Sequence, residues 1–592
     1  MTDASKRDGS IMPGRGHAGL PTSPDGSGPG AGKALGRIVS GSLSKGLSAR
    51  LDADTSVEDM AVGRYVVIAG EKRRFFGMIT DVQLEAANAQ LASAPPDVDD
   101  PFIAEVLAGT STFGALELMP MLTLDEETGA PEPVKTVPTH YSRVREASED
   151  DVSSVFGKED STHFYLGQPI DMDTKVCVDL KRLVERSSGV FGKSGTGKTF
   201  LTRLILIGIV LKNVAVNLVF DMHNEYGYKG TFEGPGDSVK GLQQLFPGRV
   251  AIFTLDPESS LRRGISADQV VEIGYDQIEP EDFELLQEVL GMTQAQMESV
   301  HRLARIFGED KWLGRFVDLA PEEREALATQ HGLNPSTLNV LHRHLEHRLL
   351  RLPFIKRKVM DNSVERILEH LKAGMNVVLE FGRHNSLEAY VLVANVLTRR
   401  IHDRYVDETE RALGSDSAKP RPLVITIEEA HKFLNPKVSE FTIFGTIARE
   451  MRKNNVTLLI VDQRPSNISD EVLSQVGTRI TCLLDDEKDT AAVLSGISGA
   501  QSLRGVLARL DSKQQAIILG HAVPMPVVIK TRDYGTAESY AELSAEIYGS
   551  PDLTIVRPPS NGESGNGESG DEPTPPKPRR PVTRLEDLFR DD

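Results

Sequence analysis

One eight-residue stretch constrains this chain more than any other. It is Gly192-Lys193-Ser194-Gly195-Thr196-Gly197-Lys198-Thr199, and it fits the spacing G-x-x-x-x-G-K-[ST] of a phosphate-binding loop. Residues 189–191 before it predict the end of a short buried strand. Residues 200–211 after it are apolar nearly all round, as in a helix buried in a core. This strand–loop–helix context favours a nucleoside triphosphate site over the alternative, a chance glycine turn before a core helix.

Each part of the loop has an expected role in holding ATP and Mg²⁺. The glycines let successive backbone N–H groups turn toward the phosphates, and the helix N-terminus adds its partial positive charge. We expect Lys198 to reach the β- and γ-phosphates and the Thr199 hydroxyl to complete the Mg²⁺ shell. The residues predicted to contact ATP are Gly192, Lys193, Ser194, Gly195, Thr196, Gly197, Lys198, Thr199 and Phe200.

Length and composition limit the class of protein. A chain of 592 residues is expected to form two to four domains. It contains no run of about 18 apolar residues and no signal peptide, which predicts a cytoplasmic protein with no membrane attachment. The two cysteines, Cys177 and Cys482, fit a reducing compartment and a structural role. A net charge of −19 argues against a surface coated in nucleic acid, but it allows a local basic channel.

The N-terminal part of the chain predicts a disordered tail followed by a small β-domain. Residues 1–33 are rich in Gly, Pro and Ser and are expected to be disordered. Short β-branched or aromatic runs separated by turns follow, as in a small antiparallel barrel. We expect this barrel at 34–170, with its later strands near 115–122 and 163–167.

The next part predicts an α/β core. Its strands are continuous apolar runs separated by helices, as in a parallel sheet covered on both faces. We expect the core at 171–275 and 373–535, interrupted by a helical subdomain at 276–372. A C-terminal segment at 536–556 precedes a disordered Pro/Gly/Ser-rich tail with a short amphipathic end, 557–592. The expected core strands lie at 214–221, 249–255, 376–381, 423–428, 456–462, 478–484 and 515–519.

Basic residues gather in the helical subdomain. They form either a solvated helix face or a DNA-facing surface, and the pattern alone leaves both open. They are Arg302, Arg305, Arg343, His344, Arg348 and the cluster 356–358.

Hydrolysis needs a carboxylate beside the phosphates, and the pair Glu428-Glu429 meets this need. The pair ends a buried-strand run at 423–427, and the carboxyl edge of a parallel sheet is where the phosphate loop lies. We assign Glu428 to Mg²⁺ and Glu429 to the attacking water. The alternative is a pair of solvated glutamates at a strand end.

Three further polar residues follow buried strands. Gln463 is the candidate sensor of the γ-phosphate, with a turn-forming residue before proline as the alternative. Asp221 and Glu225 are expected at the same edge, where they would order the water or the metal shell. A helix-capping role is the alternative for Asp221.

Arg449 and Arg452 share one helical face at i, i+3. An arginine lent across a subunit boundary would stabilise charge on the transferring phosphoryl group. The alternative for both residues is an ordinary basic helix surface.

The motifs, taken in order, resemble those of the HerA family of hexameric DNA translocases, within the FtsK/HerA group of P-loop ATPases. The resemblance covers about 34–535, and its N-terminal barrel looks like the HAS barrel of that family. The motifs lie at 192–199, 221–226, 428–431, 449–453, 462–466 and 475–480.

The resemblance implies a RecA-like ATPase core in a homohexameric ring that moves double-stranded DNA through its pore. It also implies a NurA-type nuclease as partner in DNA end resection and recombinational repair. Arg449 or Arg452 would then act on the ATP of the neighbouring subunit. The chain departs from the family pattern at Asn224 and Met451, where Gly is common, and at Glu428, where Asp is frequent.

Other functions stay open at this point. Related rings move protein substrates, serve in defence systems, or activate a nuclease by binding ATP. The chain carries no cluster of carboxylates with a lysine of the kind that nucleases use, so any cutting is expected from a partner.

Overall fold

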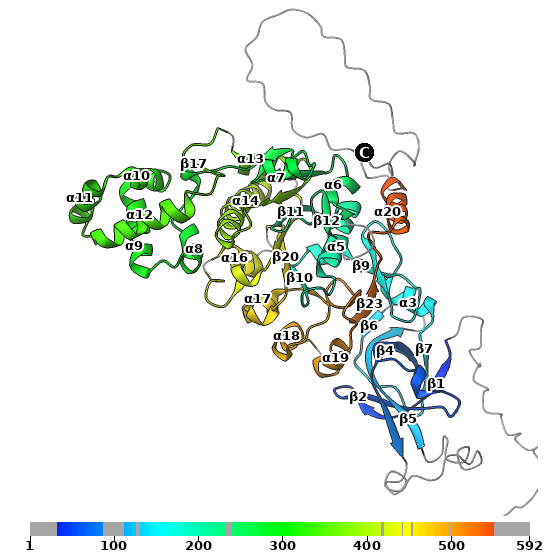
Figure 1. Cartoon of the computed structure of the whole chain (residues 1–592). Helices are drawn as coiled ribbons and strands as arrows, with labels where there is room; N and C mark the ends of the chain where they lie inside the picture. Colours follow the sequence, from blue (N-terminus) through cyan, green and yellow to red (C-terminus); the bar gives the residue numbers. More distant parts are fainter. Residues whose placement is uncertain are drawn as a thin grey trace, which may run out of the picture.

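The computed structural model describes residues 32–86, 112–125, 131–231, 238–360, 362–415, 419–440, 442–450, 454–497 and 499–549. The expected disordered tails lie outside these ranges, apart from residues 32 and 33. A small barrel and a group of helices lie at opposite ends of a central sheet (Figure 1). Among the described residues, no helix is long and apolar enough to cross a membrane.

The N-terminal domain is a closed antiparallel barrel, as its runs of β-branched and aromatic residues predict. Its strands run in the order β2-β1-β7-β3-β4-β5-β6, and an additional pairing of β2 with β5 closes the ring. Alternate residues point inward, and the interior includes Leu47, Ile68, Phe75 and Leu116. The strands are β1 (Ala34–Ser42), β2 (Gly46–Leu51), β3 (Tyr65–Ala69), β4 (Arg73–Ala86), β5 (Thr112–Asp125), β6 (Pro131–Pro133) and β7 (Arg143–Glu146).

The core is one 12-stranded sheet with the order β15-β14-β18-β11-β19-β20-β10-β21-β22-β23-β8-β9. The strands from β15 to β21 in this order are parallel, and the remainder pair antiparallel. They are β8 (His163–Gln168), β9 (Val176–Asp179), β10 (Ser188–Phe191), β11 (Val216–Asp221), β14 (Val250–Thr254), β15 (Gln269–Val270), β18 (Asn376–Glu380), β19 (Leu423–Glu428), β20 (Val456–Asp462), β21 (Thr478–Thr481), β22 (Gln515–Gly520) and β23 (Val527–Thr531).

Two features of this sheet differ from the sequence prediction. The sheet is mixed, because β22, expected as a parallel strand, runs antiparallel to β21. The strand at 163–168, expected in the barrel, pairs with β23 and β9 of the large sheet. Both differences have one physical reason, since an apolar run marks a buried strand but carries no information on its direction or its partner.

Helices cover both faces of the sheet. The helix after the phosphate loop, α5 (Lys198–Lys212), is buried at every position from Leu201 to Leu211. The others are α3 (Glu149–Phe156), α4 (Leu180–Val184), α6 (Leu242–Leu245), α7 (Pro257–Arg262), α13 (Ser363–Lys372), α14 (Leu387–Ser415), α15 (His431–Leu434), α16 (Ile443–Glu450), α17 (Asp470–Gln475), α18 (Glu487–Val493), α19 (Ala500–Leu507) and α20 (Ala537–Gly549).

The helical subdomain projects from the side of the core that lies farthest from the barrel (Figure 1). Trp312 is fully buried at its base, and its indole N–H donates to the carbonyl of Ile278 at 3.2 Å. Arg399 of α14 pairs with Asp282 at 2.8 Å and so fixes the subdomain to the core. Its helices are α8 (Asp282–Leu290), α9 (Gln294–Phe307), α10 (Trp312–Asp318), α11 (Pro321–His331) and α12 (Pro335–His344).

Candidate active site

The order of the parallel strands brings the distant motifs to one edge of the sheet. β20 lies between β10, which leads into the phosphate loop, and β19, which ends in Glu428. β11, which ends in Asp221, lies on the other side of β19. Because all four strands are parallel, their carboxyl ends meet at the same edge. Residues more than 200 positions apart in the chain therefore form one site.

The loop between β10 and α5 has the backbone that its glycines allow. Gly192, Gly195 and Gly197 have φ values of 151°, 78° and 94°, which are strained for any residue with a side chain. A Cβ on Gly192 would also lie 2.8 Å from Cβ of Cys482 and 2.9 Å from the hydroxyl of Thr196. Within the described residues, a Cβ built on Gly195 would have no heavy atom within 4 Å apart from those of Gly195 itself and its two chain neighbours. Gly192 is therefore required for both its conformation and its packing.

The Lys198 side chain folds back into the loop. Its Nζ donates to the carbonyl of Lys193 at 2.8 Å, and the Thr196 hydroxyl donates to the same carbonyl at 2.8 Å. Burial lowers the pKa of Lys198, an effect that the charges of Glu429 and Asp462, among other groups, oppose. The ammonium is thus held in the loop by one neutral acceptor, the Lys193 carbonyl, which a phosphate would replace with charged oxygens.

Glu428 is a buried carboxylate at the end of β19. Tyr226 donates its hydroxyl to Oε1 of Glu428 at 2.8 Å. The other oxygen, Oε2, is buried and has no hydrogen-bond partner among the residues that the structure describes. Burial, with the nearby Asp221 carboxylate, raises the pKa of Glu428 to about 8. An unpartnered buried carboxylate oxygen is costly and fits a place for a cation or its bound water.

Glu429 and Gln463 contact each other directly. The Gln463 amide donates to Oε1 of Glu429 at 2.9 Å. Glu429 has a φ of 48°, a conformation that a residue of its type rarely adopts. This backbone turns consecutive glutamates in different directions, so that Glu428 is buried while the Glu429 side chain is 30% exposed. The pair joins the ends of the neighbouring strands β19 and β20.

Asp221 and Glu225 belong to one tight turn. The Asp221 carboxylate accepts from the backbone N–H groups of Glu225 and Tyr226, each at 2.8 Å, and of Gly227 at 3.2 Å. Burial, with the charge of Glu380, raises the pKa of Asp221 to about 7. The Asp221 carboxylate thus closes a turn and caps no helix, because residues 222–231 contain none, while Glu225 lies partly exposed at the edge.

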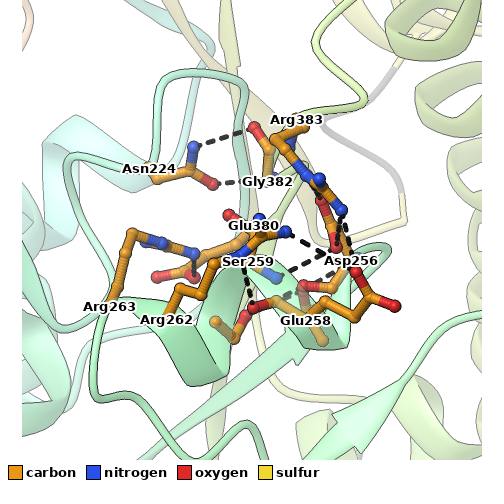
Figure 2. A network of polar contacts seen from close by, with 11 residues as sticks. Asn224, Asp256, Glu258, Ser259, Arg262, Arg263, Glu380, Gly382 and Arg383 are labelled. Atoms are coloured by element: carbon orange, nitrogen blue, oxygen red, sulfur yellow. Dashed lines mark hydrogen bonds and ion pairs between the residues drawn. The ribbon is translucent and has the colours of Figure 1, made fainter.

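A network of polar contacts fixes this turn to the next loop along the sheet edge (Figure 2). The Asn224 side chain accepts from the N–H of Gly382 at 2.9 Å and donates to its carbonyl at 3.2 Å. Arg263 donates to the buried Glu380 at 2.5 Å. Asn224 has a φ of 59°, which asparagine tolerates better than most residues. The departure from glycine at this position therefore keeps the turn and adds a clamp.

Two parts of the chain are similar to known protein families. Residues 164–401 match the family model described as the central domain of helicase HerA, and residues 35–121 match that of the HAS barrel domain. The chain belongs to the HerA family. The predicted family and the predicted α/β core with its N-terminal barrel are thereby confirmed.

Two HerA relatives come from archaea, and both are named DNA double-strand break repair helicase HerA. That of Pyrococcus furiosus is 24% identical over 410 residues, 65% of this chain and 71% of the relative. That of Sulfolobus acidocaldarius is 24% identical over 396 residues, 66% of this chain and 73% of the relative. Among solved structures, VirB4 of Thermoanaerobacter pseudethanolicus is similar at 13% identity, with a TM-score of 0.43 over 65% of this chain and 99% of VirB4.

In this HerA-family chain, Arg449 lines a cavity of about 660 Å³ that Arg186 and Arg479 also line. Arg449 donates to the carbonyl of Ser439 at 3.3 Å. Arg479 is held by three backbone carbonyls. The Arg186 residue is exposed, and its guanidinium makes no hydrogen bond or ion pair within the described residues. Arg452, the other predicted arginine, lies outside the described residues.

Two features of the HerA-family site were not foreseen. Asp462 is buried and accepts from both the backbone N–H and Nδ1 of His431, at 2.7 and 2.9 Å. Tyr226 reaches Glu428 across 202 positions of sequence. The sequence motifs contain all four residues, but nothing in their spacing pairs them.

The residues present fit a Mg²⁺ ion that is held mainly by water and phosphate. Within the described parts of the chain, no three His, Cys, Asp or Glu side chains form a ready-made metal site. Mg²⁺ at nucleotide sites commonly uses only one or two protein oxygens. The Thr199 hydroxyl and Oε2 of Glu428 are the oxygens available for that purpose.

Proposed function

We propose that this chain is an ATP-driven double-stranded DNA translocase that works with Mg²⁺ as a hexameric ring. The observation that carries the proposal is the meeting of Lys198, Glu428, Glu429 and Gln463 at one edge of the sheet. This is the set that hydrolysis of a triphosphate requires: a cation for the phosphates, a metal ligand, a base and a sensor. A chain that only bound ATP would not need the last two.

In the proposed reaction, Lys198 leaves the Lys193 carbonyl and pairs with the β- and γ-phosphates. Glu429 orients the attacking water and takes its proton, a role worth about 10²–10⁴ in rate. Gln463, whose amide donates to Glu429, would turn toward the γ-phosphate of bound ATP. Mg²⁺, with Thr199 and Glu428 as its protein ligands, would neutralise charge on the phosphates.

The position of Arg449 supports a ring. Thr457 also lines the cavity shared by Arg449, Arg186 and Arg479, which we call the arginine cavity. Thr457 lies near the start of β20, whereas Asp462 ends β20 at the edge of the sheet that carries the phosphate loop. Five residues of extended strand separate the two positions by about 16 Å. Arg449 therefore lies at the opposite end of the sheet from the loop of its own chain. We propose that Arg449, with Arg186 beside it, meets the phosphates of a neighbouring subunit.

The proposed context is DNA end resection in recombinational repair, with a NurA-type nuclease as the partner that cuts. Family membership and the names of the archaeal relatives support this context. The chain's own contribution would be movement of the duplex.

Movement can be tested by displacement of a triplex-forming strand from linear duplex DNA. We expect displacement that requires ATP and is lost in Glu429→Gln. Hydrolysis without displacement, in an assembly that binds the duplex, would contradict the proposal and favour a ring that acts on protein substrates.

A further inference from the structure

Glu428 is held by two tyrosines that are both fully buried. Tyr226 donates its hydroxyl to Oε1 of the Glu428 carboxylate at 2.8 Å. The Tyr390 hydroxyl instead contacts the backbone, accepting from the Glu428 N–H and donating to the Glu428 carbonyl, each at 3.0 Å. One tyrosine thus fixes the side chain and the other fixes the strand end.

Tyr226 is itself fixed from several sides. Its backbone N–H donates to the buried Asp221 carboxylate at 2.8 Å. Arg203 of α5, only 1% exposed, donates to the carbonyl of Glu225 at 2.5 Å, and its guanidinium carbon lies 6.0 Å from the centre of the Tyr226 ring. The Asn224 clamp on Gly382 fixes the turn from the other side. The tyrosine hydroxyl therefore has a defined position before any ligand binds.

We propose that Tyr226 is a positioning residue that selects one orientation of the Glu428 carboxylate and so leaves Oε2 for the Mg²⁺ shell. The inference rests on the proposed ATPase function. Glutamate has one more rotatable bond than aspartate, so an unheld Glu428 would lose more side-chain entropy on binding a cation. Because the tyrosine hydroxyl is neutral, it holds the Glu428 carboxyl group without adding the positive charge that a lysine or arginine would bring. This arrangement leaves Oε2 available to the Mg²⁺ shell, since it is buried and has no hydrogen-bond partner among the described residues.

The test is binding of a fluorescent, non-hydrolysable ATP analogue to the full chain over a range of Mg²⁺ concentrations and in EDTA. In Tyr226→Phe we expect the Mg²⁺ concentration for half-maximal analogue binding to rise about 10-fold. This is the lower end of the range of metal affinity, about 10- to 100-fold, that is lost when a group that orients a metal ligand is removed. Binding in EDTA should stay at the wild-type level. Tyr390→Phe is the matched control, since it removes an equally buried hydroxyl from the same glutamate and should leave the Mg²⁺ dependence unchanged.

A double-mutant cycle separates positioning from general damage. If Tyr226 acts through Glu428, then Tyr226→Phe should have no further effect on the Mg²⁺ dependence in a Glu428→Gln background. Should Tyr226→Phe fail to fold, Glu428→Asp is the second variant. It keeps both the carboxylate and the Tyr226 hydroxyl, but the shorter side chain separates them. This variant should also need more Mg²⁺ for half-maximal analogue binding.

The outcomes distinguish this inference from the proposed function. A wild-type Mg²⁺ dependence in Tyr226→Phe, or in Glu428→Asp where that variant is used, would overturn the role of Tyr226 alone. An equal shift in Tyr390→Phe would do the same, since it would reduce the effect to packing. Analogue binding by the wild-type chain that does not respond to Mg²⁺ would overturn the proposed function, and this inference with it.

Discussion

Gly192 and Gly195 lie in the same loop but differ in their surroundings. Both have positive φ values, 151° and 78°, yet only a Cβ on Gly192 would meet Cys482 and Thr196. We expect Gly192→Ala to abolish nucleotide binding and to destabilise the fold by about 1–3 kcal/mol, the cost of a strained backbone, with the clash in addition. Gly195→Ala carries strain without the clash and serves as the control. Analogue binding and thermal melting measure both effects, and equal losses in the two variants would contradict the packing argument.

Lys198 and Glu429 are expected to fail in different ways. Lys198→Ala should lose ATP binding and turnover, because the loop then lacks the ammonium that would pair with the phosphates. Glu429→Gln should bind ATP but hydrolyse it about 10²–10⁴ times more slowly, because the amide cannot take a proton from water. Trapping of radiolabelled nucleotide separates the two results. Turnover at the wild-type rate in either variant would remove that residue from the site.

At this scale the sequence predicts which residues form the site better than how they pair. The loop residues and Glu428, Glu429 and Gln463 follow from motif spacing and strand ends. The bond between Tyr226 and Glu428 does not, because it depends on the adjacency of β11 and β19, which spacing cannot fix.

Among the elements, α3 shows how one carboxylate can hold a helix start. Asp151 accepts from Arg145 at 2.6 and 3.0 Å and from the Ser148 N–H at 2.9 Å, and Ser148 caps the helix in return. Burial alone would raise the pKa of Asp151, but hydrogen bonds from Arg145 and Ser148 lower it below its ordinary value of 3.8. The ionised form is therefore the stabilising one.

The pH dependence of stability follows from that sign. The contribution of Asp151 is complete above its unfolded pKa and is lost as the pH falls through its lower folded pKa. We expect Asp151→Asn to cost about 3 kcal/mol at pH 7, as breaking a buried pair does, and to differ less from the wild type below about pH 4. Thermal melting of both proteins across this range is the measurement. A deficit that stayed constant with pH would contradict the assignment.

Element boundaries in the sheet were largely predictable, whereas direction and partnership were not. Long apolar runs such as 423–428 and 456–462 identify buried strands by composition alone. The short β2 and β7 lack such a run, and they become strands only because barrel closure supplies their partners. β22 and β8 show the same limit for direction and for domain membership.

Across the whole molecule, the arginine cavity and the phosphate loop face opposite ends of the sheet. In a ring, one subunit's arginines would then complete the next subunit's site. An equal mixture of Lys198→Ala and Arg449→Ala chains should recover part of the ATPase activity that each lacks, since some interfaces would combine an intact loop with an intact arginine. In Arg449→Ala alone, ATP turnover is expected to fall by a factor of about 10³ or more, as it does when an arginine that stabilises the transferring phosphoryl group is lost. No recovery in rings shown to exchange subunits would contradict action between subunits.

The measurement that tests the central claim most directly is the ATPase rate of the sized assembly without DNA, with single strands and with linear duplex. Lys198→Ala gives the background. We predict a hexamer-sized species whose rate rises strongly with duplex and less with single strands, and whose stimulation weakens as salt is raised. A rate that no form of DNA changes would contradict a DNA translocase and would leave a ring ATPase with another substrate.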